Sequence, residues 1–234
     1  MLLIEKEPTV AAATSSQAAG LVGQVRNSVE RTRLAMWSVE TFSQLQLDER
    51  ANPGWRQVGS LRIALCEDRI DEFRQMKSVA DQAGLKVDFI DNRMAQQLWP
   101  AMNFERVKAV LWCPSDGYLQ PSDLTMAYVA NARRMGVRIQ TATAVQSILV
   151  KDRRVIGVET DQGRVDCKTV INAAGAHAYH IAKSVGLELP IIPVRHEYFV
   201  TVAAKGLDPS LPVIRIPDAT LYLRAETNAL LCGG

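Results

Sequence analysis

Hydrophobic positions at the start of the chain follow first a strand pattern and then a helical one. The apolar run 2–4 predicts a buried parallel strand that ends on Glu5. Asn27 and Glu30 form a capping pair ahead of apolar residues at helical spacing, and predict a helix that continues to about Asp48. Its buried face is expected to comprise Ala35, Val39, Phe42 and Leu45.

A strand, a helix and a second strand are predicted in the next forty residues. Alternating side chains over 61–65 are typical of a half-buried strand. Apolar residues then recur at helical spacing as far as Gly84, which lies where a left-handed C-cap belongs. The second strand begins at Val87. The buried face of the helix is expected to comprise Ile70, Phe73, Met76 and Ala80.

The second half of the chain alternates helices with short strands. Ser122 caps a predicted helix that ends at Gly136, with Leu124, Tyr128 and Met135 directed inward. A second helix, centred on Ile181 and Ala182, ends at Gly186. Strands are expected at 137–140, in a meander of 145–151, 155–160 and 164–172, and at 198–202, 213–216 and 221–225.

This order of elements predicts an α/β fold. Parallel strand-helix-strand units mixed with antiparallel meanders indicate a nucleotide-binding layer interleaved with a second, mostly antiparallel sheet. Two intertwined domains are therefore favoured over two sequential ones.

Composition excludes several classes of protein. The 234 residues are 47% apolar and 22% charged, which excludes intrinsic disorder. Twenty-seven basic residues against 25 acidic ones give a net charge of +2, and the basic residues are scattered, so no nucleic-acid or anionic-membrane footprint is present. No apolar run has the length of a membrane span, and no secretory signal is recognisable. We expect a cytoplasmic or organelle-matrix protein with a small-molecule partner.

Cysteine and histidine patterns give no support to a metal site. The four cysteines lie tens of residues apart without Cys-x-x-Cys spacing, and are interpreted as free thiols. The histidines are His177, His180 and His196, too few for a well-supported metal centre.

Two early segments have side chains suited to a nucleotide. Glu5 ends its strand where a dinucleotide-binding fold places an acidic residue that accepts hydrogen bonds from ribose hydroxyls. Residues 14–23 combine hydroxyls, small residues and glycines, which allow close approach to a phosphate or a flat heterocycle. A solvated turn and a flexible surface loop explain the same residues, and both interpretations stay open.

Two later segments have comparable features. A predicted buried strand at 170–172 runs into Ala173, Ala174 and Gly175 at a helix start, where backbone amides suit a cofactor phosphate or ribityl chain. Tight strand-to-helix packing is the alternative. In two short strands near the C-terminus, polar and apolar side chains alternate, and a solvated sheet face explains this pattern equally well. One face would present His196, Tyr198, Tyr222 and Arg224.

The order of these segments resembles the D-amino-acid oxidase type of FAD-dependent oxidoreductases. The shared segments are the strand ending in Glu5, Ala-Ala-Gly-Leu-Val-Gly-Gln-Val-Arg at 18–26, Asp-Gly-Tyr-Leu-Gln-Pro from 116, Gly-Val-Arg-Ile from 136, Val-Ile-Asn-Ala-Ala-Gly from 170, and Arg-His-Glu-Tyr-Phe-Val-Thr from 195. Within the family the chain is most similar to the dimethylglycine and sarcosine dehydrogenase branch. That branch includes a flavoprotein-like regulatory subunit of pyruvate dehydrogenase phosphatase.

The resemblance implies roles for individual residues. Glu5 would hold the adenosine ribose of FAD, and Val145 would pack near the adenine. His196 and Tyr222 would lie at the substrate site, and Arg224 or Arg195 would pair with a substrate carboxylate. Residues implied near the pyrophosphate, the isoalloxazine or the opposite side of FAD are Ser15, Ser16, Gln17, Ala18, Gly20, Leu21, Ala173, Ala174 and Gly175.

Two departures from the family pattern modify these expectations. Dehydrogenases of the branch usually have Trp-His before Ala-Ala-Gly, and that histidine bonds covalently to the flavin; here the pair is Ser16-Gln17, so bound FAD is expected to be non-covalent. The family's Gly-x-Gly-x-x-Gly turn and its C-terminal part are missing from the sequence. We therefore expect an incomplete chain, a truncated gene or half of a split protein, that retains FAD weakly and is inactive in isolation.

The resemblance also implies a division of the chain and an activity. Residues 1–50 and 116–187 are expected to form a partial Rossmann-like FAD-binding domain, and 51–115 and 188–234 a substrate domain built on an antiparallel sheet. The implied reaction is oxidation of an N-methylated glycine or a similar secondary or tertiary amine by hydride transfer to flavin. The electron acceptor is left open. Alternatives are a non-catalytic regulatory or interaction module, or a relative such as a glycerol-3-phosphate dehydrogenase or tRNA-modifying flavoenzyme.

Overall fold

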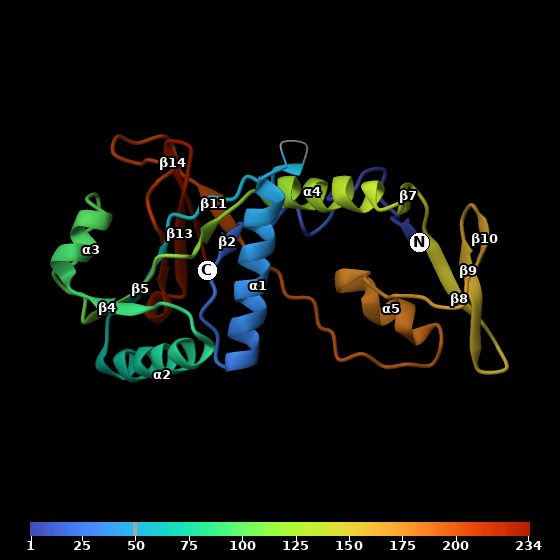
Figure 1. Ribbon diagram of the computed structural model, residues 1–234, viewed down its shortest axis with the longest axis horizontal. Helices are drawn as coiled ribbons and strands as arrows, with labels where there is room; N and C mark the ends of the chain where they lie inside the picture. The colour runs from blue at the N-terminus through green and yellow to red at the C-terminus, as the bar shows by residue number, and fades with distance from the viewer. Residues whose placement is uncertain (49–50) are drawn as a thin grey trace. The chain divides into compact units, whose positions relative to one another are not determined.

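The computed structural model describes residues 1–48 and 51–234 (Figure 1). They divide into two compact units. Unit 1 comprises residues 1–18 and 128–195, and unit 2 comprises 19–127 and 196–234. Each unit is built from segments far apart in the sequence. The domain boundary expected after residue 50 falls at residues 49–50, outside the described part of the chain.

Unit 1 contains two small sheets. β1 (Leu2–Ile4) pairs in parallel with β7 (Arg138–Gln140). The predicted parallel strand is thus present, although Leu3 is 42% exposed and the strand is not fully buried. An antiparallel meander follows, in the order β10-β9-β8. Its strands are β8 (Val145–Lys151), β9 (Arg154–Thr160) and β10 (Gly163–Asp166), and the short helix α5 (Ala178–Lys183) completes the unit.

The predicted strand 164–172 is wrong beyond Asp166. β10 pairs with β9 in a register that joins Asp166 to Gly157, so that residues after about 169 would extend past Arg154, where β9 begins. Within the described chain no strand pairs with 170–172, and Ile171 is 75% exposed. The segment that leads to Ala173 is therefore an extended surface segment and not a buried strand.

Unit 2 is organised around a seven-stranded mixed sheet in the order β11-β14-β13-β12-β3-β5-β4. Only the β12–β3 pair is parallel, and the other pairs are antiparallel. A two-stranded pair, β2 (Leu21–Val22) with β6 (Gly117–Tyr118), lies outside it. The strands are β3 (Ser60–Ala64), β4 (Asp88–Ile90), β5 (Ala109–Cys113), β11 (Tyr198–Val200), β12 (Val213–Ile216), β13 (Leu221–Glu226) and β14 (Ala229–Gly233).

Three helix ends in unit 2 lie at residues that favour such ends. Ser28 accepts a hydrogen bond from Arg31 N and caps α1 (Val29–Gln46), while Asp91 caps α3 (Asn92–Leu98) in the same manner. α2 (Glu67–Ala83) ends at Gly84, whose φ of 83° confirms the predicted left-handed C-cap.

The two faces of the large sheet differ in chemistry. One face is apolar and is covered by α3, with Ala95 and Trp99 packed over Leu61, Ile63 and Ile214. On the other face, α2 covers only the part made by β3, β5 and β4. There a second core contains Val25, Ala64, Phe73, Ala80, Leu85, Val87, Leu111 and Cys113. Figure 1 shows α2 and α3 on opposite sides of β4 and β5.

Helix α4 (Pro121–Arg134) links the units, since the boundary falls between Ala127 and Tyr128. It begins with proline at its first position, where no backbone N–H is needed. Leu124 packs against a third cluster in unit 2, but Tyr128 and Met135 are 45% and 80% exposed. Their predicted inward orientation is wrong, because the cluster that Leu124 contacts does not continue along the helix.

Candidate functional site

The polar half of the large sheet presents a row of side chains across neighbouring strands. Arg62 of β3 pairs with Arg215 of β12, and Arg215 pairs with Tyr222 of β13. Gly233 of β14 lies opposite Tyr222 and also opposite Tyr198 of β11. Residues directly opposite one another project from the same face of a sheet. We call Arg62, Arg215, Tyr222 and Tyr198 the polar row. It lies on the same face as α2 and runs from β3, which α2 partly covers, to β11.

Asp116 connects the segment before α1 to β3, next to the polar row. Its carboxylate is 1% exposed. Oδ1 accepts hydrogen bonds from Gln24 N at 2.8 Å and Gln24 Nε2 at 3.0 Å, and Oδ2 accepts one from Ser60 Oγ at 2.6 Å. Gln24 Nε2 also donates to Ser115 Oγ at 2.8 Å. The segment that precedes α1 is thereby held against the strand that carries Arg62.

The two arginines of the row are cations that have been partly removed from water. Burial is the main cause that lowers the pKa of Arg62 to about 10, and the neighbouring Arg215 adds to the effect, while Asp116 opposes it. Burial likewise lowers the pKa of Arg215, with Arg26 adding to the effect and Asp116 and Tyr222 opposing it. Both guanidinium groups stay protonated at neutral pH.

Tyr222 lies flat over the neighbouring strand. A Cβ atom placed on Gly233 would overlap the Tyr222 hydroxyl and ring, so the phenol occupies the space that the glycine leaves. The hydroxyl makes no hydrogen bond within residues 1–48 and 51–234. It is therefore available to a ligand on this face.

Arg224, expected at the substrate carboxylate, is engaged inside the protein. It is 2% exposed, and its Nε donates to Ala19 O at 2.6 Å. Nη1 donates to Ala225 O at 3.0 Å and lies 2.6 Å from Glu226 Oε2. The guanidinium also lies over the Tyr118 ring, 5.0 Å from its centroid. Arg224 thus joins β13 to the segment that begins at Ala19, whereas Arg62 and Arg215 form no ion pair among the described residues.

His196 lies in an extended, exposed segment just before β11, and is not itself part of a strand. Tyr198, two residues later, shares the polar row with Tyr222 through Gly233. Arg195 is exposed as well. The structure therefore brings Tyr198 and Tyr222 onto one face, as expected from the sequence. It records no contact between His196 and either tyrosine in the described residues.

In unit 1, several residues implied at the cofactor meet at one end of β1. Glu5 Oε1 accepts a hydrogen bond from Glu7 N at 2.9 Å, and Glu5 O accepts one from Thr143 N at 3.0 Å, two residues before Val145. Lys6 Nζ lies 3.4 Å from His177 Nε2. That contact brings the segment containing Ala173, Ala174 and Gly175 to the same place as Glu5.

The residues around the expected pyrophosphate lie in both units. Ser15, Ser16, Gln17 and Ala18 belong to an exposed run of turns in unit 1, with Gln17 N donating to Thr14 O at 3.2 Å. Gly20 and Leu21 belong to unit 2. Gly20 has a φ of 75°, and a Cβ there would overlap Leu119 O, while Leu21 pairs with Tyr118. Packing alone accounts for these last two residues.

These residues fit a dinucleotide such as FAD. A carboxylate beyond the end of β1 suits ribose hydroxyls, and the small, exposed residues 173–175 leave their backbone open to a ligand. Glu5, Val145 and 173–175 are the residues that would hold it in unit 1. Among the described residues no cluster of histidine, cysteine and acidic side chains could hold a metal ion, and the four cysteines are free thiols.

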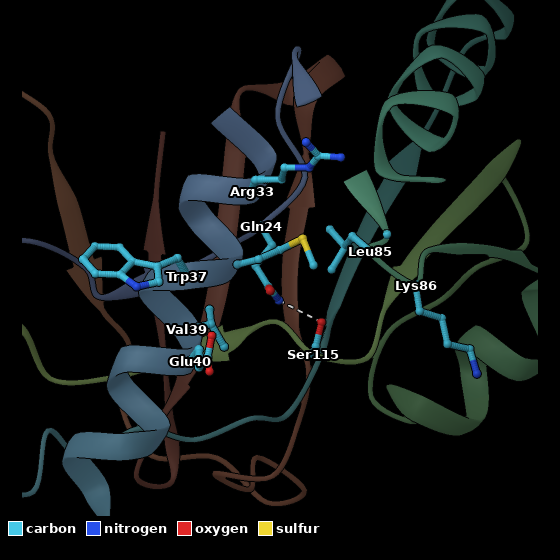
Figure 2. A pocket seen from close by; sticks show the side chains of 10 residues that line it. Gln24, Arg33, Trp37, Val39, Glu40, Leu85, Lys86 and Ser115 are labelled. Carbon is cyan, nitrogen blue, oxygen red and sulfur yellow. Dashed lines mark hydrogen bonds between the residues drawn. The ribbon is translucent and has the colours of Figure 1, made fainter. Parts of the chain in front are cut away.

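A groove of about 500 Å³ lies elsewhere on unit 2, between α1 and residues 84–86 (Figure 2). Met36, Trp37 and Leu85 supply its apolar lining, and Arg33, Glu40 and Lys86 lie at its charged rim. The hydrogen bond from Gln24 to Ser115 forms part of its floor. Gln24 therefore lines the groove and also donates hydrogen bonds to Asp116. No residue of the polar row lines the groove.

Sequence reasoning missed the two arginines and the role of Asp116. A signal was present: Arg62 and Arg215 interrupt the apolar strands Leu-Arg-Ile-Ala and Val-Ile-Arg-Ile. A charge inside an otherwise apolar strand is costly unless it faces a partner or a ligand. The parallel register between β3 and β12, which makes the two arginines neighbours, could not be inferred from either strand alone.

Comparison with known proteins identifies the family. Residues 1–234 match the family described as "DAO: FAD dependent oxidoreductase". The chain belongs to this family. The predicted mixed α/β fold and the predicted relationship to D-amino-acid oxidase-type flavoproteins are thereby confirmed.

Individual relatives cover the whole chain. It is 33% identical over 232 residues to 4-methylaminobutanoate oxidase (formaldehyde-forming) of Paenarthrobacter nicotinovorans, covering 99% of this chain and 28% of that protein. It is 33% identical to the mitochondrial dimethylglycine dehydrogenase of Homo sapiens, covering 100% of this chain and 27% of that protein. The L-proline dehydrogenase from P. horikoshii has the same fold, with a TM-score of 0.90 at 22% identity, over 100% of this chain and 62% of that one. The chain thus spans little more than a quarter of these two curated relatives.

None of the helices in the described part of this DAO-family chain has the length and apolar character needed to cross a membrane.

Proposed function

We propose that this DAO-family chain belongs to an FAD-dependent enzyme that oxidises an N-methylated amino acid or a similar secondary or tertiary amine. Family membership supports the flavin chemistry. Relatives named for oxidation of 4-methylaminobutanoate and dimethylglycine support the substrate class. The observation that carries the proposal is the polar row, in which a guanidinium lies beside a phenol on neighbouring strands.

The polar row supplies what such a substrate requires from the protein. Arg215 offers a planar pair of donors to the substrate carboxylate, and Tyr222 on the adjacent strand offers a hydroxyl to the amine end. Charge-assisted hydrogen bonds to the carboxylate would fix the orientation of the molecule. FAD, when bound, accepts the hydride, and the protein contributes binding, orientation and electrostatics. His196 lies exposed just before β11, two residues from Tyr198 of the row.

We further propose that FAD binds without a covalent bond. Gln17 occupies the position where the resemblance places a flavin-bonding histidine, and an amide has no nucleophilic ring nitrogen. Its exposed turn between Ser15 and Ala18 leaves the position open to solvent. Denaturing the holoprotein with acid and separating protein from supernatant tests this: all flavin should appear in the supernatant. Flavin that stays with the protein pellet would contradict non-covalent binding.

Turnover by the FAD-bound protein, produced from its whole coding sequence, tests the proposed activity. We expect loss of sarcosine, dimethylglycine or 4-methylaminobutanoate with release of formaldehyde. The variant Tyr222→Phe keeps the ring over Gly233 but removes the hydroxyl, and should lower kcat by about tenfold. Leu65→Val, an exposed change away from the row, is the matched control. Unchanged kinetics in Tyr222→Phe would remove the hydroxyl from the site, and the absence of oxidation with every amine would contradict the function.

A further inference from the structure

Three arginines of unit 2 act electrostatically on one another and share the influence of a single carboxylate. Arg62 and Arg215 lie side by side in the polar row, and Arg26 influences both of them electrostatically, as does Asp116. A Cβ on Gly23 would lie 3.5 Å from Asp116 Oδ2 and 3.9 Å from Arg26 Nη1, so both side chains lie beside Gly23. We call Arg26, Arg62 and Arg215 the arginine triad.

Asp116 does not neutralise the triad. The hydrogen bonds that its carboxylate accepts all come from the neutral groups of Gln24 and Ser60. Within residues 1–48 and 51–234, neither Arg62 nor Arg215 forms an ion pair. Glu72, the other acidic side chain that acts on Arg62, is exposed and paired with Arg69. Three positive charges therefore face one negative charge.

This excess matters because the row is partly buried. A cation that has been removed from water without a partner is destabilising, and its partner need not belong to the protein. One carboxylate engages one guanidinium through two parallel hydrogen bonds. A ligand with a single carboxylate on Arg215 would leave the charge of Arg62 uncompensated, whereas a second carboxylate would pair with it.

We infer that the arginine triad binds a ligand with two carboxylates, so that among N-substituted amino acids the site favours those with a second carboxylate. The amine oxidation of this ligand rests on the proposed function, whereas its binding to the arginines does not. One carboxylate lies on Arg215, beside Tyr222, and the second lies on Arg62, one strand further from the phenol. Arg26, in the segment before α1, is exposed and adds positive charge that acts on both arginines.

Strand spacing sets the length of the ligand. Neighbouring strands lie about 4.8 Å apart, so two guanidinium groups in register on β3 and β12 suit carboxylates a short chain apart. Glutarate, with three methylene groups between its carboxylates, has this reach and lacks an amine. Its monoamide, glutaramate, has the same size but one charge less. Comparing the affinities of glutarate and glutaramate therefore measures the contribution of the second carboxylate to binding.

Calorimetric titration of the 234-residue chain with each compound, at fixed ionic strength, tests the inference. Glutarate should bind about tenfold more tightly than glutaramate, as expected for one additional charge-assisted contact. Arg62→Gln should reduce glutarate affinity to that of glutaramate and leave glutaramate binding nearly unchanged. Arg74→Gln, an exposed arginine of α2 paired with Asp71, is the matched control and should keep the preference.

Equal affinities for the two compounds, or a preference that survives in both Arg62→Gln and Arg215→Gln, would overturn the inference. If Arg62→Gln does not fold, Arg62→Lys is the second variant, because it keeps the positive charge. Arg62→Lys should still prefer glutarate to glutaramate. Loss of this preference in Arg62→Lys would also count against the inference. The titration needs no flavin and no turnover. Glutarate preference without amine oxidation would contradict the proposed function alone, and oxidation of monocarboxylic amines without glutarate preference would contradict this inference alone.

Discussion

At the scale of single residues, the polar face depends on a glycine that leaves room for a tyrosine ring and on a buried carboxylate that accepts hydrogen bonds. Gly233 leaves room for the Tyr222 ring, and Asp116 holds Gln24 and Ser60 in place. Neither residue needs to touch a ligand to matter. Each determines where a residue of the polar row, or the strand that carries it, lies.

Gly233→Ala should displace Tyr222, because a methyl group there overlaps the phenol. We expect a destabilisation of about 1–3 kcal/mol by urea unfolding, the usual cost of overpacking. The same substitution in a Tyr222→Ala background should cost much less, because the ring is absent. An equal cost in both backgrounds would show that the ring and the glycine are not coupled.

Asp116→Asn should destabilise unit 2 by about 1–3 kcal/mol, since the amide that replaces one carboxylate oxygen would confront donors from Gln24 and Ser60. Urea unfolding followed by tryptophan fluorescence measures this. Asp68→Asn on the exposed surface of α2 is the control and should change stability little. A neutral effect of Asp116→Asn would mean that the carboxylate does not anchor the segment before α1.

At the scale of elements, the connection between β12 and β13 is fastened to the start of α2. Asp218 accepts hydrogen bonds from Leu65 N at 2.8 Å and from Arg69 Nε at 3.0 Å. The Leu65 amide is the main cause that lowers the pKa of Asp218 below its ordinary 3.8, and Arg69 adds to it. These contacts hold the turn that separates Arg215 from Tyr222.

This contact predicts a dependence of stability on pH. Because the folded pKa of Asp218 is lowered, its contribution is present above pH 3.8 and is lost as the pH falls through the lowered value. Asp218→Asn should therefore reduce the urea midpoint at pH 7 and change it less at pH 2. A reduction of equal size at both pH values would mean that the charge of the carboxylate is not what stabilises the turn.

Sequence patterns predicted elements correctly where the stabilising interactions involve residues that are adjacent in the sequence. The C-cap at Gly84 and the strand at 213–216 agree with the structure, because caps and short apolar strands depend on adjacent residues. The predicted strand at 164–172 failed beyond Asp166, because a strand requires a partner and β9 begins at Arg154. The predicted inward orientation of Met135 was wrong for a similar reason, because helical spacing does not indicate how far a neighbouring core extends.

At the scale of the whole molecule, the order of motifs was enough to identify the family but not the site. Glu5, Val145 and Gly175 were predicted near one another from the resemblance, and unit 1 brings their segments together. Arg224 looked like a carboxylate ligand by its position in β13, yet its partners come from Ala19 and Glu226. Arg62 and Arg215 became neighbours only through a register that joins residues about 150 positions apart.

Anaerobic mixing of the FAD-bound protein, produced from its whole coding sequence, with N-methylated amino acids is the most direct test of amine oxidation. The account predicts that the visible absorbance band of the oxidised flavin bleaches on mixing, and that Arg215→Gln requires much higher substrate concentrations for the same rate. Arg74→Gln, the exposed control, should bleach like the unmodified protein. A flavin that stays oxidised with every mono- and dicarboxylic amine, although it is stoichiometrically bound, would contradict the account.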